Sequence, residues 1–353
     1  MVLEKRNSSF ELLRIVSMLL IVMHHYTIHG GFDFNSQFTF RMFFVQILQI
    51  GGKIGVNLFV LISGYFLCKS TFKWEKIFKL EFQVLFYSII IGVVFLFFFP
   101  DLQIKILNCF FPLYSNMYWF YSAYLFLILL SPYINKLINS IEKKEFQNLL
   151  KIIIILWVVI PIIPKVDALS MSELGWFIFL YLCSAYIRLY GEDFYQHIRT
   201  YFHIGVICYI LLLGTVWGFD LLGLFNSRFK TYFGYFGQMN SFFTFFCSVF
   251  IFIGFSKLKI RYNFVINLIA STTFGIYLLH DNPFVRKILW DDIFNNKDYL
   301  YTNKIFLHSF ITIMLVFIIC VIIDLVRQYV FEKPLLLVLE KIKIMKKKNI
   351  AQL

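Results

Sequence analysis

The chain has 353 residues, of which 60% are hydrophobic and only 15% are charged, and its mean hydropathy is +0.75. Soluble domains are closer to half apolar and a quarter charged, so the composition excludes an ordinary soluble enzyme and indicates a polytopic membrane protein. The formal net charge of +13 would suit a nucleic-acid partner. The basic residues lie mainly between the hydrophobic stretches, however, and this placement argues against nucleic acid.

Ten hydrophobic stretches predict ten membrane-spanning helices, each approaching the roughly 20 residues that cross a bilayer. They lie near residues 10–30, 46–67, 78–99, 117–135, 150–164, 173–190, 202–220, 239–256, 262–280 and 305–326. About 22 Lys and Arg residues fall on one side of this topology and about 9 on the other, which predicts that both termini are cytoplasmic. We expect one all-α membrane domain over 1–353, with spans over about 10–330 and a basic cytoplasmic tail at 331–353.

The first stretch carries Arg14 and His25, eleven positions apart. At 100° per residue the two side chains lie within about 20° of one face, separated by roughly 16 Å along the axis. Ionisable groups inside a bilayer are costly and by default mark function. We take His25 as the candidate base and Arg14 as a candidate catalytic and donor-binding residue. The neighbouring His24 is rotated by about 100°, so we take it as a third candidate catalytic residue, one that orients the base or packs beside it.

Structural explanations stay open for the same residues. Glu11 precedes Arg14 by three positions, so a helix-surface ion pair could account for the arginine. A lone intramembrane histidine can be a satisfied core residue. A metal role has little support, because the six cysteines are scattered without metal-ligand spacing and no HExxH pattern occurs. We therefore expect no metal site and no permanently bound cofactor.

Three further stretches hold polar or aromatic residues in ordered patterns. The second, near residues 51–65, combines glycines that permit close helix packing with Lys53, Asn57, Ser63 and Tyr65. The fourth begins at an aromatic cluster containing Trp119, which an interfacial aromatic belt would also explain. The ninth ends at His280, at the same expected outer level as His25. The candidate substrate-binding residues are Asn57, Ser63, Tyr65, Trp119 and His280.

Taken in order, these motifs resemble the acyltransferase 3 family of integral membrane acyltransferases. The similarity lies in the opening segment 7–14, the Arg-x10-His spacing of Arg14 and His25, the segments 55–65 and 274–280, the Trp119-Phe120 pair and Glu332-Lys-Pro334. The resemblance covers nearly the whole chain. It implies a multi-pass protein of the bacterial cytoplasmic membrane that modifies cell-envelope or exported polysaccharides, usually by O-acetylation.

The resemblance also implies an acyl-CoA donor, most simply acetyl-CoA, and a glycan or lipid-linked oligosaccharide acceptor. Arg14 would hold a CoA phosphate or the thioester arm, since guanidinium matches phosphate oxygens. His25 would take the proton of the sugar hydroxyl or carry the acyl group itself. Asn57, Ser63 and Tyr65 are candidates for stabilising the thioester oxyanion. Two rival hypotheses are an exporter of a glycan, glycolipid or acyl group, and an assembly partner without catalysis.

Overall fold

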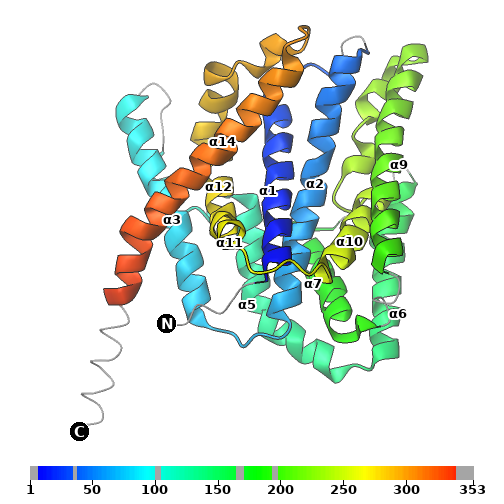
Figure 1. The fold of residues 1–353 in the computed structure, drawn as a ribbon, viewed down its shortest axis with the longest axis vertical. Coiled ribbons are helices and arrows are strands. Elements are labelled where there is room, and N and C mark those ends of the chain that lie inside the picture. Colours follow the sequence, from blue (N-terminus) through cyan, green and yellow to red (C-terminus); the bar gives the residue numbers. More distant parts are fainter. Residues whose placement is uncertain (1–6, 35–37, 100–104, 164–170, 193–197, 339–353) are drawn as a thin grey trace.

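The computed structural model describes residues 7–34, 38–99, 105–163, 171–192 and 198–338, and its regular elements over these ranges are all helical (Figure 1). The α-helices are α1 Ser8–Ile28, α2 Phe40–Leu67, α3 Trp74–Phe98, α4 Ile106–Phe110, α5 Trp119–Ser140, α6 Lys143–Ile154, α7 Glu173–Tyr190, α9 Ile198–Phe225, α10 Phe242–Ser256, α11 Phe264–Ala270, α12 Thr273–His280, α13 Pro283–Lys287 and α14 Ile305–Arg327. Short π and 3-10 segments follow α6, α9, α13 and α14: Ile155–Val159, Ile160–Ile162, Ser227–Tyr232, Tyr235–Gly237, Ile288–Ile293, Asn296–Tyr299 and Gln328–Glu332. The expectation of an all-α polytopic membrane bundle is confirmed.

Helices occupy all ten stretches that the sequence predicted as spans. Eight helices of the described residues are long and apolar enough to cross a membrane, and a bent helix pair raises the number to nine. The sixth predicted span coincides with α7, which is not among them. Its 18 residues include Glu173 and Arg188, which lower its mean hydropathy. The basic segment 341–348, at the end of the expected tail, lies outside the described residues.

The ninth predicted span is not one straight helix. It breaks between α11 and α12, and the chain then bends by 71° between Phe264–His280 and the helical segment Pro283–Tyr299. Asn282 caps the second segment by accepting a hydrogen bond from the Phe284 amide at 3.0 Å, and Pro283 stands at its first position, where a missing amide hydrogen costs nothing. This bend places His280 and Asp281 inside the bundle, where both are buried.

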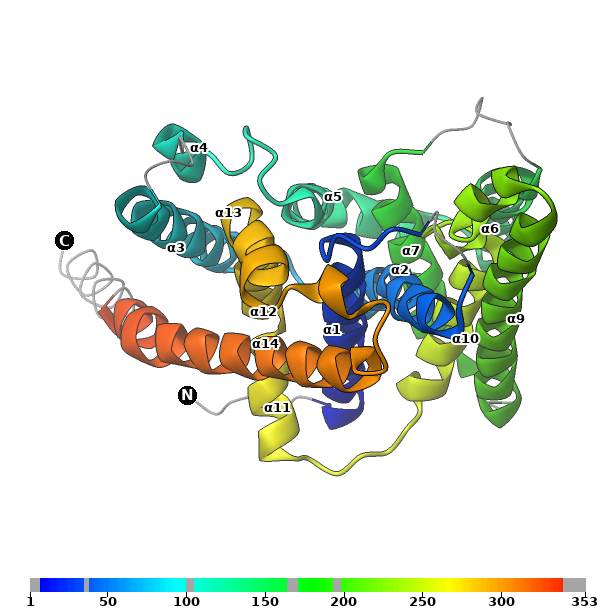
Figure 2. The same ribbon diagram turned by 90° about the horizontal axis from the view of Figure 1, so that it is seen from above.

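The centre of the bundle is the pair α1 and α2, which lie side by side in Figures 1 and 2. Small residues of α2 permit the close approach that the sequence predicted. A side chain at Gly55 would meet the Ser17 carbonyl oxygen of α1 at 2.5 Å, and one at Gly52 would collide with the His24 ring. Because no larger residue fits there, α1 is held at a fixed depth and rotation against α2.

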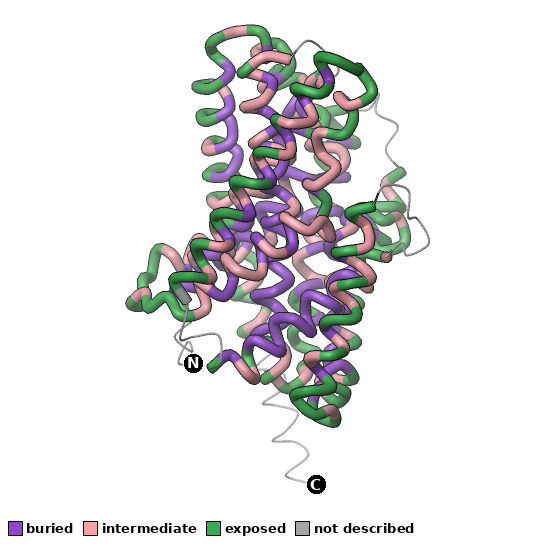
Figure 3. Tube along the Cα trace, turned by 90° about the vertical axis from the view of Figure 1, so that its right-hand side faces the viewer, coloured by how far each residue is buried: buried purple, intermediate pink, exposed green. Residues whose placement is uncertain are grey.

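Seen from above, α3 lies toward one end of the molecule and α6 and α9 at the other, with α1 and α2 between them, and α14 runs from beside α1 toward the α3 end (Figure 2). Buried residues run through the middle of the bundle, whereas exposed residues follow its periphery (Figure 3). Many exposed residues of α3, α9 and α14 are large and apolar, as expected for surfaces that face lipid. The histidine-bearing face of α1 is therefore enclosed by protein.

Candidate active site

The structure brings together two histidines that are 255 positions apart. The Nδ1 atom of His25 on α1 lies 2.8 Å from the Nε2 atom of His280 at the end of α12, and both side chains are buried. The other ring nitrogen of His280, Nδ1, lies 2.5 Å from the Ile276 carbonyl oxygen. Two candidate site residues thus form one continuous hydrogen-bonded chain.

The donors and acceptors in this series of hydrogen bonds determine which ring nitrogens of His280 and His25 carry a proton. The Ile276 carbonyl only accepts, so Nδ1 of His280 must donate to it, and Nε2 of a neutral His280 then accepts. His25 therefore donates from Nδ1 to His280. This leaves Nε2 of His25 as a lone pair, and no described residue bonds to it. His25 is thus held in the tautomer that a general base requires.

A buried carboxylate stands beside the histidine pair. The Asp281 Oδ1 atom lies 3.7 Å from His25 Nδ1 and 3.2 Å from His29 Nε2, and an Arg286 nitrogen lies 3.8 Å from it. A negative charge at this distance stabilises His25 after it has taken up a proton. Asp281 is not among the candidate site residues that the sequence analysis named. Its position directly after His280 was the available signal.

His25, His29 and Asp281 could also hold a metal ion, since one ligand atom of each lies within 4.8 Å of the others. Binding through Nδ1 of His25 would break its 2.8 Å hydrogen bond to His280. The donor set is therefore a poor fit as long as the histidine chain is intact, and the expectation of no metal stays a prediction.

One pocket, called here the His25 pocket, opens onto the histidine. The cavity itself is small, about 20 Å³, within about 350 Å³ of empty space that includes open solvent at its mouth. It is lined by Met18, Ile21, His25, Val56, Phe59, Trp119, Phe120, Phe274 and Tyr277. Met18, Ile21 and His25 follow the same helical face as Arg14 at intervals of three or four residues. The face that spacing predicted is thus the α1 wall of this pocket.

The α1 wall of the pocket begins at Met18, and Arg14 lies one helical turn before it. Its Nε atom is buried and has no hydrogen-bond partner among the described residues. A buried donor on a cation without a partner costs free energy unless something outside the chain binds it. Glu11 does not accept from this nitrogen. The anion-binding role of Arg14 therefore stays a prediction.

His24 points away from the histidine chain. Its Nδ1 atom lies 2.6 Å from the Gln49 carbonyl oxygen of α2, and its ring packs on Gly52. His24 therefore helps to fix the rotation of α1 against α2, and a catalytic role for it stays a prediction.

Asn57 lies at a junction of three elements. Its Nδ2 atom donates to the Met239 carbonyl at 2.8 Å, and its Oδ1 atom accepts from the Trp176 indole at 2.9 Å. The Ser248 hydroxyl lies 3.4 Å from the same Nδ2 atom. The Asn57 side chain is completely buried, with its amide fully used between α2, α7 and α10. In this arrangement no donor is left for a substrate.

Ser63 and Tyr65 lie toward the other end of α2. The Ser63 hydroxyl donates to the Phe59 carbonyl of its own helix at 2.9 Å. The Tyr65 hydroxyl accepts from an Arg188 nitrogen at 2.7 Å, and the guanidinium also lies 4.4 Å from the tyrosine ring centre. Neither residue lines the His25 pocket. Trp119 does, with the Lys53 ammonium 5.5 Å from its ring.

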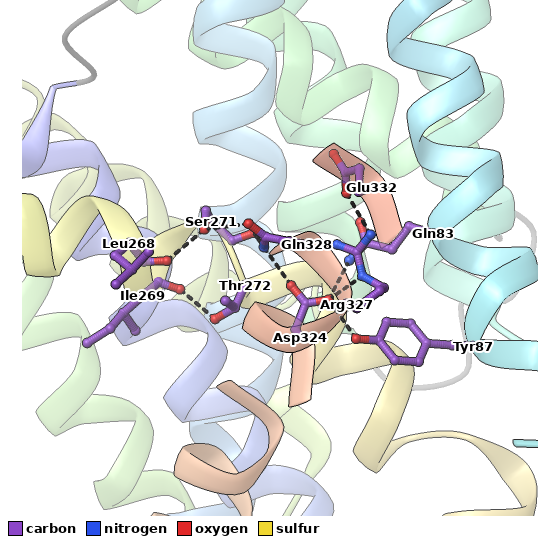
Figure 4. A network of polar contacts seen from close by, with 10 residues as sticks. All are labelled: Gln83, Tyr87, Leu268, Ile269, Ser271, Thr272, Asp324, Arg327, Gln328 and Glu332. Carbon is purple, nitrogen blue, oxygen red and sulfur yellow. Dashed lines mark hydrogen bonds and ion pairs between the residues drawn. The ribbon is translucent and has the colours of Figure 1, made fainter. Parts of the chain in front are cut away.

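A second buried polar cluster, called here the Asp324 network, ties α14 to α3 and to the start of α12 (Figure 4). Arg327 Nε donates to Asp324 Oδ1 at 2.7 Å and one of its terminal nitrogens to Glu332 at 2.6 Å. A side chain at Gly275 would collide with the Asp324 carboxylate, so this glycine permits the contact. Three further side chains donate to Asp324, namely Gln83, Tyr87 and Gln328.

Comparison with known proteins agrees with this arrangement. A family model described as an acyltransferase domain, Acyl_transf_3, matches residues 7–325. The chain belongs to the acyltransferase 3 family. The match includes α1, α2, α5 and α12, and therefore every residue that lines the His25 pocket. Searches among curated proteins and solved structures gave no significant match. Family membership supports membrane acyltransferase activity for this chain.

Proposed function

We propose that this membrane acyltransferase transfers an acetyl group from acetyl-CoA to a sugar hydroxyl of a cell-envelope or exported polysaccharide. The observation that carries the proposal is the hydrogen-bonded chain from the Ile276 carbonyl through His280 to His25. It presents a lone pair on a buried imidazole to an otherwise largely apolar pocket. An imidazole is suited to taking the proton of a weakly acidic hydroxyl.

The reaction follows from these positions. The acceptor oxygen attacks the thioester carbonyl carbon while its proton passes to Nε2 of His25. Asp281 and His280 stabilise the imidazolium through Nδ1. The tetrahedral intermediate then collapses, the carbon–sulfur bond breaks, and the CoA thiolate takes the proton from His25. The products are an O-acetyl sugar and free CoA, and His25 returns to its starting tautomer.

Arg14 supports a charged donor. CoA carries phosphates that match a guanidinium, and Arg14 offers a buried nitrogen with no partner. It lies on the same helical face as His25, roughly 16 Å along the axis. A pantetheine arm can bridge such a separation between a bound phosphate and the reacting thioester. The donor would then reach the His25 pocket along the α1 face.

A second, larger cavity supports a sugar acceptor. It combines aromatic rings with amides and hydroxyls, which suit the apolar faces and hydroxyl groups of a carbohydrate. Its lining includes Gln49, Tyr232, Tyr235, Gln238 and Asn240. Gln49 also contacts His24 through its backbone carbonyl, so this cavity adjoins the histidine-bearing segment of α1.

The test is transfer of radiolabelled acetyl from acetyl-CoA into the glycan fraction of membranes that contain either wild type or His25→Ala. We expect alkali-labile label with wild type and a loss of about 10³-fold with His25→Ala, because a general base contributes about 10² to 10⁴. Equal label in both would remove His25 from the mechanism. No label with wild type, together with no binding of acetyl-CoA by the purified protein, would favour the exporter instead.

A further inference from the structure

The hydroxyl of Tyr277 differs from every other buried tyrosine hydroxyl in the described part of the chain. Eight tyrosines are buried, and seven of them have a hydrogen-bond partner: Tyr26, Tyr65, Tyr87, Tyr118, Tyr121, Tyr181 and Tyr186. The Tyr277 hydroxyl has no acceptor for its proton among the described residues, although its side chain is only 4% exposed, and the Phe120 backbone amide at the start of α5 faces its oxygen. Such a group costs free energy in the resting protein and calls for an explanation.

The surroundings of Tyr277 explain its unpaired hydroxyl, because this residue lines the His25 pocket. It lies one turn before His280 on α12, so the helix that orients His25 also carries this hydroxyl. The Tyr277 ring packs 5.8 Å from the Phe120 ring, centre to centre, in a T-shaped contact. The unpaired donor therefore belongs to the wall of the pocket that holds the candidate base.

The start of α5 meets the same pocket. Trp119 and Phe120 are the first two residues of this 22-residue helix, and both line the His25 pocket. The first amides of a helix have no acceptor within it, and no side chain caps this end of α5. These amides and the helix dipole favour negative charge at this position. Two kinds of donor thus converge on one cavity.

The residues expected to stabilise an oxyanion do not reach this cavity. Asn57 is fully hydrogen-bonded between helices, Ser63 donates to its own helix, and the Tyr65 hydroxyl is engaged with Arg188. An acyl transfer in the His25 pocket still requires donors for the oxygen that becomes negative. Tyr277 is the unpaired buried donor available there among the described residues.

We propose that the Tyr277 hydroxyl and the backbone amides at the start of α5 form the oxyanion site, which binds the carbonyl oxygen of the acyl thioester. This inference rests on the proposed acyl transfer and names the residues that stabilise its intermediate. When the acceptor oxygen bonds to the carbonyl carbon, the second carbon–oxygen bond pair moves onto the carbonyl oxygen. Tyr277 and the α5 amides donate to that oxygen, and the pair returns when the carbon–sulfur bond breaks. Tyr277 keeps its own proton throughout.

Tyr277→Phe tests the proposal, with Tyr181→Phe as the matched control. Tyr181 is equally buried, but its hydroxyl donates to Asn135 at 2.6 Å on α5, and it does not line the pocket. We expect Tyr277→Phe to lower kcat for acetyl transfer by about 10² to 10³, since one oxyanion donor contributes about that much. The KM for acetyl-CoA and the thermal unfolding temperature should stay near wild type. Tyr181→Phe should show the reverse, with a lower unfolding temperature and a kcat near wild type.

A second readout does not depend on turnover. In a His25→Ala background, the infrared carbonyl band of bound [1-¹³C]acetyl-CoA should lie at lower frequency with Tyr277 present than with Tyr277→Phe, because a hydrogen bond weakens the carbonyl. A kcat within twofold of wild type or an unchanged carbonyl band in the Tyr277→Phe proteins would overturn the oxyanion site and leave the proposed function standing. No acetyl transfer by wild type would overturn both.

Discussion

Buried polar groups are paired in the Asp324 network, whereas several of those around the His25 pocket have no hydrogen-bond partner. In the network, Asp324 accepts from four side chains, and Arg327 pairs with two carboxylates (Figure 4). Around the pocket, a lone pair of His25, the Tyr277 hydroxyl and the Arg14 Nε atom have no bonding partner among the described residues. Both regions lie in the same bundle and are enclosed by the same kinds of helix.

The difference separates structure from chemistry. A buried charge that is fully paired holds helices in place, and removing one partner is strongly destabilising. A buried group left open costs the resting protein free energy, and that cost is offset only when a ligand supplies the missing bond. Substitutions in the network should therefore affect stability, whereas substitutions around the pocket should affect turnover or binding.

Among the substitutions that test this comparison, the largest effect is expected at His280, the positioning residue of the pocket. His280→Leu removes the acceptor for His25 Nδ1, so His25 loses its fixed tautomer, and kcat should fall by about 10². His280→Gln retains a side-chain oxygen that can accept the same hydrogen bond and should recover activity to within about tenfold of wild type. Steady-state acetyl transfer by both variants checks this. Equal losses of kcat in His280→Leu and His280→Gln would contradict the tautomer argument.

Substitutions in the Asp324 network should lower the free energy of unfolding rather than kcat. Arg327→Met leaves the buried Asp324 carboxylate without its cation, which should lower the free energy of unfolding by about 3 kcal/mol. The specific activity of the folded fraction should stay near wild type. Thermal and denaturant unfolding in detergent measure the first quantity, and transfer normalised to folded protein measures the second.

Lys79→Gln is the matched control for Arg327→Met. It removes the half-exposed Lys79–Glu332 pair, whose closest atoms are 3.8 Å apart, and such a pair contributes less than about 1 kcal/mol. A similar loss of stability in both variants would show that burial of the Asp324 network does not set its contribution.

A smaller effect is expected at Arg14, and it should appear in donor binding. Arg14→Ala should raise the KM for acetyl-CoA by about 10- to 100-fold, the size of one to two charge-assisted hydrogen bonds. Acetyl-pantetheine, which lacks the nucleotide phosphates of CoA, should bind wild type and Arg14→Ala alike. If the variant keeps the wild-type preference for acetyl-CoA over acetyl-pantetheine, Arg14 does not bind the nucleotide part of the donor.

Much of the fold follows from local sequence. Hydrophobic stretches of sufficient length indicate membrane helices wherever they occur, and the described helices fall in all ten predicted stretches. The glycines of α2 indicated close packing because a residue without a side chain permits it in any partner. The break between α11 and α12 and the 71° bend that follows His280 were not predicted, because apolar composition alone does not reveal where a helix breaks or bends.

The sequence by itself determined which residues share the functional face of α1, because 100° per residue fixes the relation between positions 14 and 25 within one helix. Only the tertiary structure decided which atoms meet across helices. His25 with His280, Asn57 with Trp176 and Tyr277 with the start of α5 depend on the depth and rotation of separate helices. Many small packing contacts between helices, such as Gly52 against His24, together set this depth and rotation. No single stretch of sequence specifies all of these contacts.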